Sequence, residues 1–144
     1  MKINRTTTPA VKLSTWSLGG SGACDTTTQA AINLARSRGT VVVIASGNDN
    51  DNANNYNPGN CAGVVNVAST NRSGGRAYYS NYGTSIDVAA PGGAQNSAND
   101  SNGVLSTHNS GTTVPGSECL HLILQGTSMA GANIAAGVAA LILQ

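Results

Sequence analysis

Ser128, in the run Gly126–Ala130, is the side chain of this sequence best placed to do chemistry. It follows an apolar run over residues 120–124 and precedes an alanine-rich pattern of helical period. That order predicts a turn from a strand into a helix, with the hydroxyl exposed near the positive end of the helix dipole. A hydroxyl held there can act as a nucleophile, although a serine that only caps the helix would show the same pattern.

A nucleophilic serine needs a donor for the oxyanion that it creates, and Asn48 is the candidate. Asn48 follows the apolar run Val41–Ile44 after three small residues, at the carboxyl end of an expected buried strand. Active sites of parallel sheets collect at that end. The Asn48 amide could therefore act together with the backbone N–H of Ser128, while an asparagine that closes a local turn is the competing interpretation.

The remaining motifs are weaker. We expect His108 in a polar loop and His121 in a strand, and neither has the context of a catalytic base. The run Gly20–Gly22 is typical of a dinucleotide loop, but Asp25 stands where the third glycine belongs, so a nucleotide-binding domain is the weaker alternative. Asp49–Asp51 suggests calcium, yet Asn60 stands where an EF-hand needs glutamate, so we expect a solvated loop there.

The elements that must position these residues alternate between strand and helix. A strand over residues 11–18 leads to a helix that begins with a capping box of Thr26 and Gln29 and ends at Gly39. Further strands are expected at 41–44, 64–67, 86–89, 104–107 and 120–124, and a helix from Ser128 onward, with polar loops at 48–60 and 95–102. This pattern predicts one α/β domain over residues 1–144, with a mainly parallel sheet flanked by helices.

Composition excludes several classes of partner. The net charge is +1 and only 9% of residues are charged, which argues against nucleic acid and anionic membrane surfaces. No apolar run approaches the length of a membrane span, and no apolar segment after Met1 indicates a signal peptide. The three cysteines lack CxxC spacing, so we expect no zinc site, and a disulfide between two of them would imply an oxidising compartment.

Five short segments, taken together, resemble the C-terminal half of the subtilisin-like serine peptidases, particularly the secreted bacterial members. In chain order they are Ser17–Gly20, Ala45–Asn48, Ser80–Gly83, Val88–Gly92 and Gly126–Ala130. The resemblance extends from about Val11 to Leu143. It implies a partial subtilisin-like fold and a serine-type endopeptidase that is a monomer, acts on an extended peptide or protein substrate and comes from a secreted parent.

The resemblance also implies a role for particular residues. Ser128 would be the nucleophile, and Asn48 would supply the side-chain half of the oxyanion hole. Cys24 and Cys61 would form a disulfide. Calcium is common in the family, but no residues here define a site. Three groups of residues would contact the substrate. Its backbone would pair with Ser17, Leu18 and Gly19. The primary specificity pocket would be walled by Ala45, Ser46 and Gly47, and Thr127 would bind substrate beside the nucleophile.

The sequence departs from the family in two ways. The family's Asp and His motifs precede the Ser-Leu-Gly segment, but only 16 residues precede Ser17 and neither motif occurs. We therefore expect a fragment that folds marginally and has little or no activity alone, with a non-catalytic peptide-binding module or degenerate peptidase as the alternative. One extra residue after Ala130 would also rotate the helix beyond it by about 100°, which affects the burial of Val138, Leu141 and Ile142.

Overall fold

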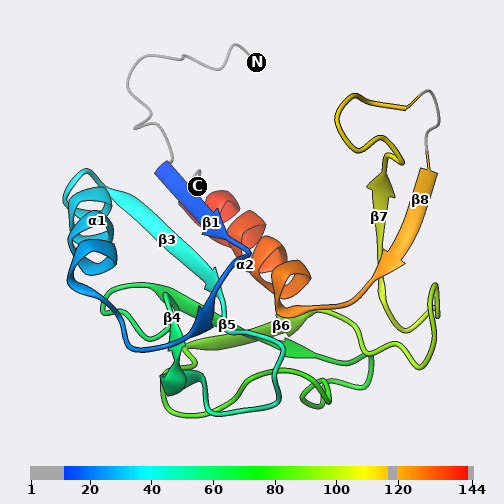
Figure 1. Ribbon diagram of the computed structural model, residues 1–144, viewed down its shortest axis with the longest axis horizontal. Coiled ribbons are helices and arrows are strands. Elements are labelled where there is room, and N and C mark those ends of the chain that lie inside the picture. Colours follow the sequence, from blue (N-terminus) through cyan, green and yellow to red (C-terminus); the bar gives the residue numbers. More distant parts are fainter. Residues whose placement is uncertain (1–11, 117–119, 143–144) are drawn as a thin grey trace.

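The computed structural model describes residues 12–116 and 120–142, and its centre is a four-stranded parallel sheet (Figure 1). The strands lie in the order β1-β3-β5-β6. Their bounds are Lys12–Trp16 for β1, Thr40–Ala45 for β3, Val65–Thr70 for β5 and Val88–Pro91 for β6. The structure thus confirms the α/β class with a mainly parallel sheet.

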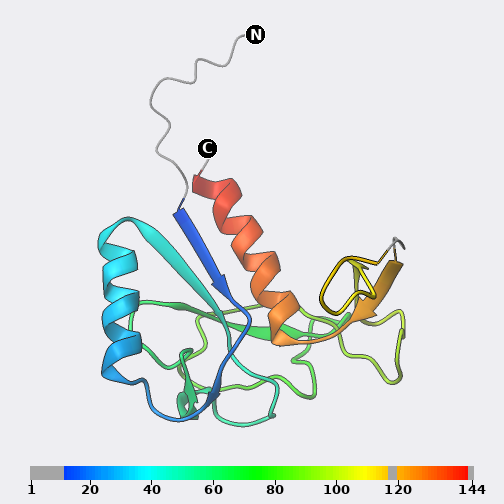
Figure 2. The same ribbon diagram turned by 45° about the horizontal axis from the view of Figure 1, so that its top comes forward.

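Two helices flank the strands. Helix α1 spans Thr26–Ser37 and packs on β3, while α2 spans Thr127–Ile142 and contacts all four strands of the sheet. Figures 1 and 2 show β1 and β3 lying between the two helices. Val43, Val67 and Ala90 form a buried cluster with Ala130 and Ala135 of α2. Because side chains alternate along a strand, the intervening residues of β3 face the opposite side of the sheet.

The last turn of α2 leaves the core. Leu141 is 70% and Ile142 45% exposed, whereas Val138 is partly buried. The helix is continuous from Thr127 to Ile142. Ala130, Gly131 and Ala135 are small, so the first turns of the helix lie close to the sheet. The buried face of α2 therefore consists of small side chains rather than large ones.

The start of α1 differs from the predicted capping box. Asp25, not Thr26, is the N-cap, and its carboxylate accepts the backbone N–H of Thr28 at 2.8 Å and the Thr28 hydroxyl at 2.6 Å. Gln29 instead bridges to the backbone N–H and carbonyl of Ala62, at 2.8 and 3.0 Å. The capping-box prediction was wrong because this long-range contact takes the glutamine side chain away from the helix start.

We expect the Asp25 cap to make stability depend on pH in the acid range. The hydrogen bonds from Thr28, first from its side chain, lower the pKa of Asp25 from 3.8 to about 2. A carboxyl group with a lowered folded pKa stabilises the fold above its unfolded pKa and loses that contribution as pH falls through the folded value. The wild type should therefore lose stability between about pH 4 and about pH 2 through this group.

The matched variant is Asp25→Asn, which keeps an N-capping oxygen but does not titrate. Thermal unfolding followed by circular dichroism should give a higher unfolding temperature for the wild type than for the variant near neutral pH. The difference between the two unfolding temperatures should shrink toward pH 2. Asp100, whose pKa is lowered by the backbone N–H groups of Asn96 and Asn102, is present in both proteins and cancels. A gap that stays constant with pH would contradict the role of Asp25.

Short elements complete the fold and revise the predicted boundaries. Strand β2 (Gly20–Ser21) pairs antiparallel with β4 (Tyr56–Asn57), which follows the 3-10 turn η1 (Ala53–Asn55), so the predicted polar loop 48–60 contains two ordered elements. The strand expected at 86–89 lies instead at Val88–Pro91, because Val88 pairs with Val67 and the Ile86 N–H closes a turn to Gly83. Residue 11 of the first predicted strand lies outside the described residues.

Strands β7 (Val104–His108) and β8 (Leu120–Leu124) form an antiparallel hairpin that stands out from the sheet (Figures 1 and 2). The prediction of β8 is confirmed. His108 was expected in a loop, which is wrong: it is the last residue of β7 and pairs with Leu120. His121 lies in β8 as expected. Both histidines are therefore at the outer end of the hairpin.

The predicted disulfide is present. Cys24, just before α1, is bonded to Cys61 with a Cα–Cα distance of 5.1 Å. The bridge ties the start of α1 to the segment that follows β4. Cys119 lies outside the described residues. Over the two described ranges, no helix is long and apolar enough to cross a membrane.

Candidate active site

Ser128 is the second residue of α2, at the amino end of the helix. The chain enters the helix through Gly126, whose φ of +150° few other residues adopt. The Gly126 N–H donates to the carbonyl oxygen of Gly92 at 2.9 Å, which fixes the turn to the end of β6. Ser128 thus follows a strand-to-helix turn as expected, but it is partly buried rather than exposed.

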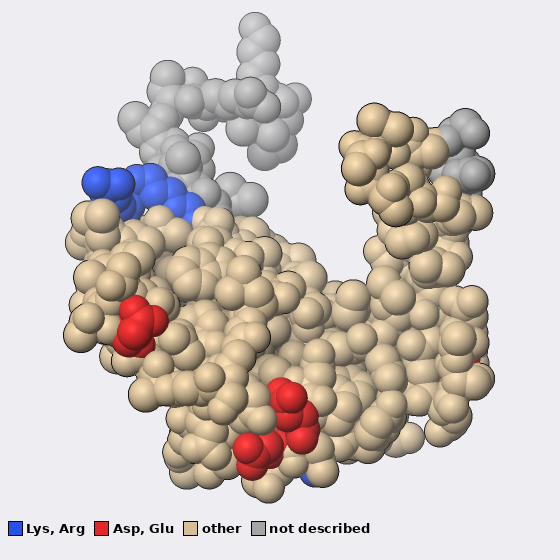
Figure 3. All heavy atoms as spheres, viewed as in Figure 1, with Lys and Arg blue, Asp and Glu red and all other residues tan. Residues whose placement is uncertain are grey.

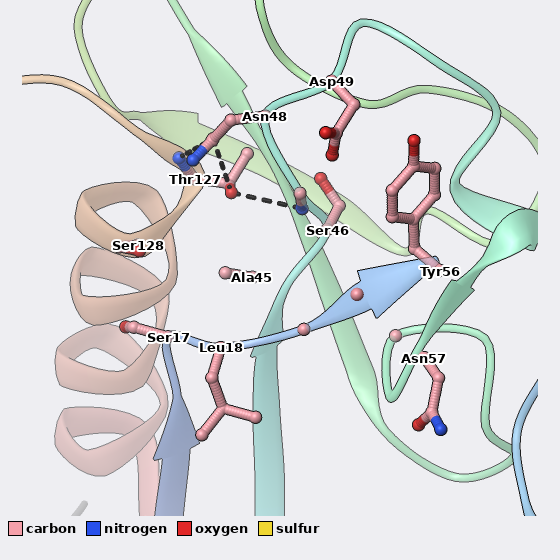
Figure 4. Close-up of a pocket in the computed structure, with 14 residues that line it drawn as sticks. Ser17, Leu18, Ala45, Ser46, Asn48, Asp49, Tyr56, Asn57, Thr127 and Ser128 are labelled. Carbon is pink, nitrogen blue, oxygen red and sulfur yellow. Dashed lines mark hydrogen bonds between the residues drawn. The ribbon is translucent and has the colours of Figure 1, made fainter. Parts of the chain in front are cut away.

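Asn48 lies directly beside this turn. Its side-chain oxygen Oδ1 accepts the backbone N–H and the hydroxyl of Thr127, both at 2.9 Å (Figure 4). Because the oxygen must be the atom that accepts a backbone N–H, the amide orientation is determined, and Nδ2 is the end left to donate. Nδ2 lies 3.6 Å from the position that a Cβ on Gly126 would take, on the side where the helix begins.

Thr127 locks the two segments together. It is 1% exposed, and its hydroxyl oxygen accepts the Gly47 N–H at 3.2 Å while donating to Asn48. Its predicted role was substrate binding. Thr127 lines the cavity described below, and its hydroxyl is engaged by Gly47 and Asn48; the substrate-binding role stays a prediction.

A buried asparagine, Asn81, holds the loop that carries Asn48. Its Oδ1 accepts the N–H groups of Asp49 at 2.9 Å and Asp51 at 3.1 Å, and its Nδ2 donates to the Ser46 carbonyl at 2.9 Å. Gly47 packs against it so closely that a Cβ there would lie 2.3 Å from Nδ2. One fully buried side chain therefore joins three backbone groups of the loop 46–51.

All nine residues predicted for the site line one cavity of about 270 Å³. They are Ser17, Leu18 and Gly19 after β1, Ala45, Ser46, Gly47 and Asn48 after β3, and Thr127 and Ser128 at the start of α2. Figure 4 shows Leu18 and Ala45 on one side of this space and Asn48 and Thr127 on another. The structure brings them together; the catalytic and binding roles remain predictions.

The cavity lining also includes five residues that were not among the predicted site residues: Gly20, Asp49, Tyr56, Asn57 and Gly59. They come from β2, from the loop after Asn48 and from β4 with the turn that follows it. Burial, and then the negative charges of Asp49 and Asp51, raise the pKa of Tyr56. Gly20 belongs to the segment Ser17–Gly20, and Asp49 had been considered only for calcium. The other three residues had no sequence signal beyond the polar run 48–60, which does not distinguish a cavity wall from a solvated loop.

Neither histidine lines this cavity, and both lie on the hairpin that projects from the body (Figure 1). Over residues 12–116 and 120–142 there is also no group of three or more His, Cys, Asp or Glu side chains that could hold a metal ion. The described site thus contains a candidate nucleophile and oxyanion donor without a neighbouring imidazole.

A serine at the start of a helix, an amide donor beside it and a cavity walled by an extended segment are three features of a peptidase that acts through serine on a parallel α/β sheet. The family model described as "Subtilase family" matches residues 1–144. This chain belongs to the subtilase family.

Individual relatives agree. An extracellular protease of Xanthomonas campestris pv. campestris is 52% identical over 126 residues, which cover 88% of this chain and 20% of that protein. Subtilisin BL of Lederbergia lenta is 37% identical over 125 residues, 87% of this chain and 39% of that protein.

Solved structures show the same fold. A protease structure from Pseudoalteromonas arctica has a TM-score of 0.85 at 63% identity and covers 97% of this chain and 41% of that one. A cold-adapted subtilisin-like serine proteinase has a TM-score of 0.71 at 32% identity, covering 92% and 41%. The partial subtilisin-like fold is thereby confirmed, and the chain spans between a fifth and about two fifths of the length of these relatives.

Proposed function

We propose that this chain carries the nucleophile and the oxyanion hole of a serine endopeptidase. Ser128 Oγ would attack the scissile carbonyl carbon of a peptide, and the carbonyl oxygen would take up the negative charge. Asn48 Nδ2 and the Ser128 N–H would donate to that oxygen. The observation that carries this proposal is the pair of hydrogen bonds from Thr127 to Asn48 Oδ1, which leaves Nδ2 as the donor beside the serine.

The substrate would be an extended peptide or protein segment. Ser17, Leu18 and Gly19 continue from β1, an edge strand of the sheet, and Leu18 is 65% exposed. An exposed backbone of this kind can pair with a peptide added as a further strand. The names of two relatives, an extracellular protease and an extracellular basic protease, support secretion of the parent protein, and we propose that it acts as a monomer.

The proton released by Ser128 must go to a base, and no histidine lines the cavity. We propose that the base and the acid that orients it come from polypeptide outside this sequence. In subtilisin, losing the histidine costs about as much as losing the whole triad, and the oxyanion hole with substrate binding retains about 10³–10⁴-fold over water. The chain alone should consequently show little or no turnover of a protein substrate.

The second candidate function is a peptide-binding module without catalysis. The observation that favours it is a cavity formed by all the predicted site residues, with no imidazole in its lining. Chemical rescue separates the two, because free imidazole can replace a missing histidine only where a serine and an oxyanion hole are already aligned.

We expect casein to be left intact by the chain, and an activated ester such as p-nitrophenyl acetate to be hydrolysed faster when imidazole is added. Imidazole by itself also hydrolyses such esters, so the rate with imidazole alone is subtracted. The remaining, protein-dependent acceleration should disappear in Ser128→Ala and persist in the control Ser106→Ala, which changes an exposed serine of the hairpin. Rescue that is equal in Ser128→Ala would favour the binding module. Ser128-dependent digestion of casein without imidazole would contradict the proposal that the base lies elsewhere.

A further inference from the structure

We infer that the cavity beside Ser128 accepts a long, positively charged side chain, so that the site selects Lys or Arg at the residue whose carbonyl Ser128 attacks. This inference rests on the proposed function, because it names the substrate class of the same site. It is carried by one carboxylate in the cavity wall, Asp49, and one unpartnered buried hydroxyl, Ser46, with a second carboxylate and a second unpartnered polar side chain behind the wall.

Asp49 is the charged group of the cavity lining. Its backbone N–H is fixed by Asn81, while its carboxylate has neither a hydrogen bond nor an ion pair with any described residue. Figure 4 shows this carboxylate beside Ser46 and Tyr56. A carboxylate held at a cavity wall without a counter-ion favours a cationic ligand.

Asp51 adds a second negative charge behind the wall. Its carboxylate accepts the Tyr56 hydroxyl at 3.4 Å, and no described residue forms an ion pair with it. Arg76 is the cation that contacts this loop, but its guanidinium donates to Asn50 and to the Ser80 carbonyl and lies over the Tyr82 ring. In Figure 3 most Lys and Arg atoms of this face lie near α1, and a few lie at the lower edge beside an acidic patch.

Ser46 supplies an unmatched hydroxyl at the same place. The residue lines the cavity and is 2% exposed, yet its Oγ has no hydrogen-bond partner. Figure 4 shows this oxygen directed toward Asp49 and Tyr56. A buried hydroxyl without a partner destabilises the empty site, and a ligand that donates to it removes that cost.

Asn66 provides a second unmatched group behind the wall. It is fully buried in the middle of β5, and both Oδ1 and Nδ2 lack partners. It pairs in register with Ile44, which places it on the same sheet face as Ser46. Gly59 of the cavity wall packs on it, since a Cβ there would lie 2.9 Å from Asn66 Oδ1.

These groups discriminate among substrate side chains. A Lys ammonium carries three donors and an Arg guanidinium five, so either can satisfy Asp49 and the Ser46 oxygen together. A Phe or Leu side chain would remove water from the carboxylate and leave both groups without a partner. A Glu side chain would be repelled by the two acids.

The test uses Ser128→Ala protein, so that binding is measured without turnover and does not depend on the reactivity of the serine. The probes are N-terminally dye-labelled Ala-Ala-Pro-X amides with X as Lys, Arg, Phe, Leu or Glu, followed by fluorescence anisotropy. We expect Lys and Arg to bind about tenfold more tightly than Phe, the scale of one hydrogen bond to a charged group, and Glu to bind most weakly.

Two variants assign the preference to its source. Asp49→Asn should remove most of the preference for Lys over Phe, while Asp49→Glu should keep it. Ser46→Ala should weaken Lys binding several-fold and leave the unfolding midpoint unchanged or raised, because it removes an unpartnered buried hydroxyl. The inference is overturned if Phe or Leu binds as tightly as Lys, if Asp49→Asn keeps the preference, or if none of the peptides binds.

Discussion

Replacing Asn81 with alanine is expected to destabilise the protein by about 3–4 kcal/mol and to abolish peptide binding. The substitution would leave two backbone N–H groups, of Asp49 and Asp51, and the Ser46 carbonyl without their present partner. These groups bracket Asn48 in the chain, so the oxyanion donor would lose its fixed position even where the fold survives. Urea unfolding, followed by fluorescence and circular dichroism, measures the change in free energy.

Asn71→Ala is the matched control. Asn71 makes the same kind of side-chain contact, with Oδ1 accepting the N–H groups of Ser73 and Gly75 at 2.9 and 3.1 Å, but the bonds lie at the surface, where water can replace them. We expect that variant to lose less than about 1 kcal/mol. Equal losses in the two variants would contradict the claim that burial gives Asn81 its importance.

The structure explains why widely separated motifs belong to one site. Gly92 contacts both the Gly126 turn and Ser69: a Cβ on Gly92 would lie 2.5 Å from the Gly126 carbonyl oxygen and 2.1 Å from Ser69 Oγ. The hydroxyl of Ser80 accepts the Ser69 N–H at 2.9 Å. The segments at Ser80–Gly83 and Val88–Gly92 therefore act by supporting the turn and the loop that present Ser128 and Asn48.

Much of this arrangement could be predicted from the sequence because it depends on local patterns. A continuous valine run gives a buried strand at β3, and small residues around Ser128 allow a close turn into a helix. Parallel strands place their carboxyl ends at one edge of the sheet, so residues that follow β1 and β3 meet the start of α2. The nine site residues meet for that reason.

Features that depend on distant partners could not be predicted. Gln29 fits a local capping box equally well, and only its contact with Ala62, 33 positions away, assigns the cap to Asp25. Tyr56 enters the cavity wall because β4 pairs with the two-residue strand β2, which has no periodic pattern of its own. Asn66 lies between two valines in the sequence, and only the structure shows that this polar side chain is fully buried.

Removing the disulfide is expected to lower the free energy of unfolding about as much as Asn81→Ala does. Cys24 and Cys61 are separated by 37 positions, and restricting a loop of that length in the unfolded chain stabilises the fold by about 3–4 kcal/mol on the chain-entropy account. That is a large share of the total stability of a typical domain. We therefore expect Cys24→Ser/Cys61→Ser to unfold at a clearly lower urea concentration, or to fail to fold at 37 °C.

The disulfide also affects the site. Cys61 lies two residues after Gly59, in the segment that follows β4, and Gly59 forms part of the cavity wall. Loss of the bridge should weaken peptide binding before the protein unfolds, since side-chain hydrogen bonds of Gln29 and of Asn57 to Asp25 then hold the wall to α1. Cys119→Ser is the control that keeps the bridge, and a reducing agent should lower the urea midpoint of this control and the wild type but not of the double variant. A double variant with the wild-type midpoint would show that the contacts around Gln29, rather than the disulfide, secure this side of the cavity.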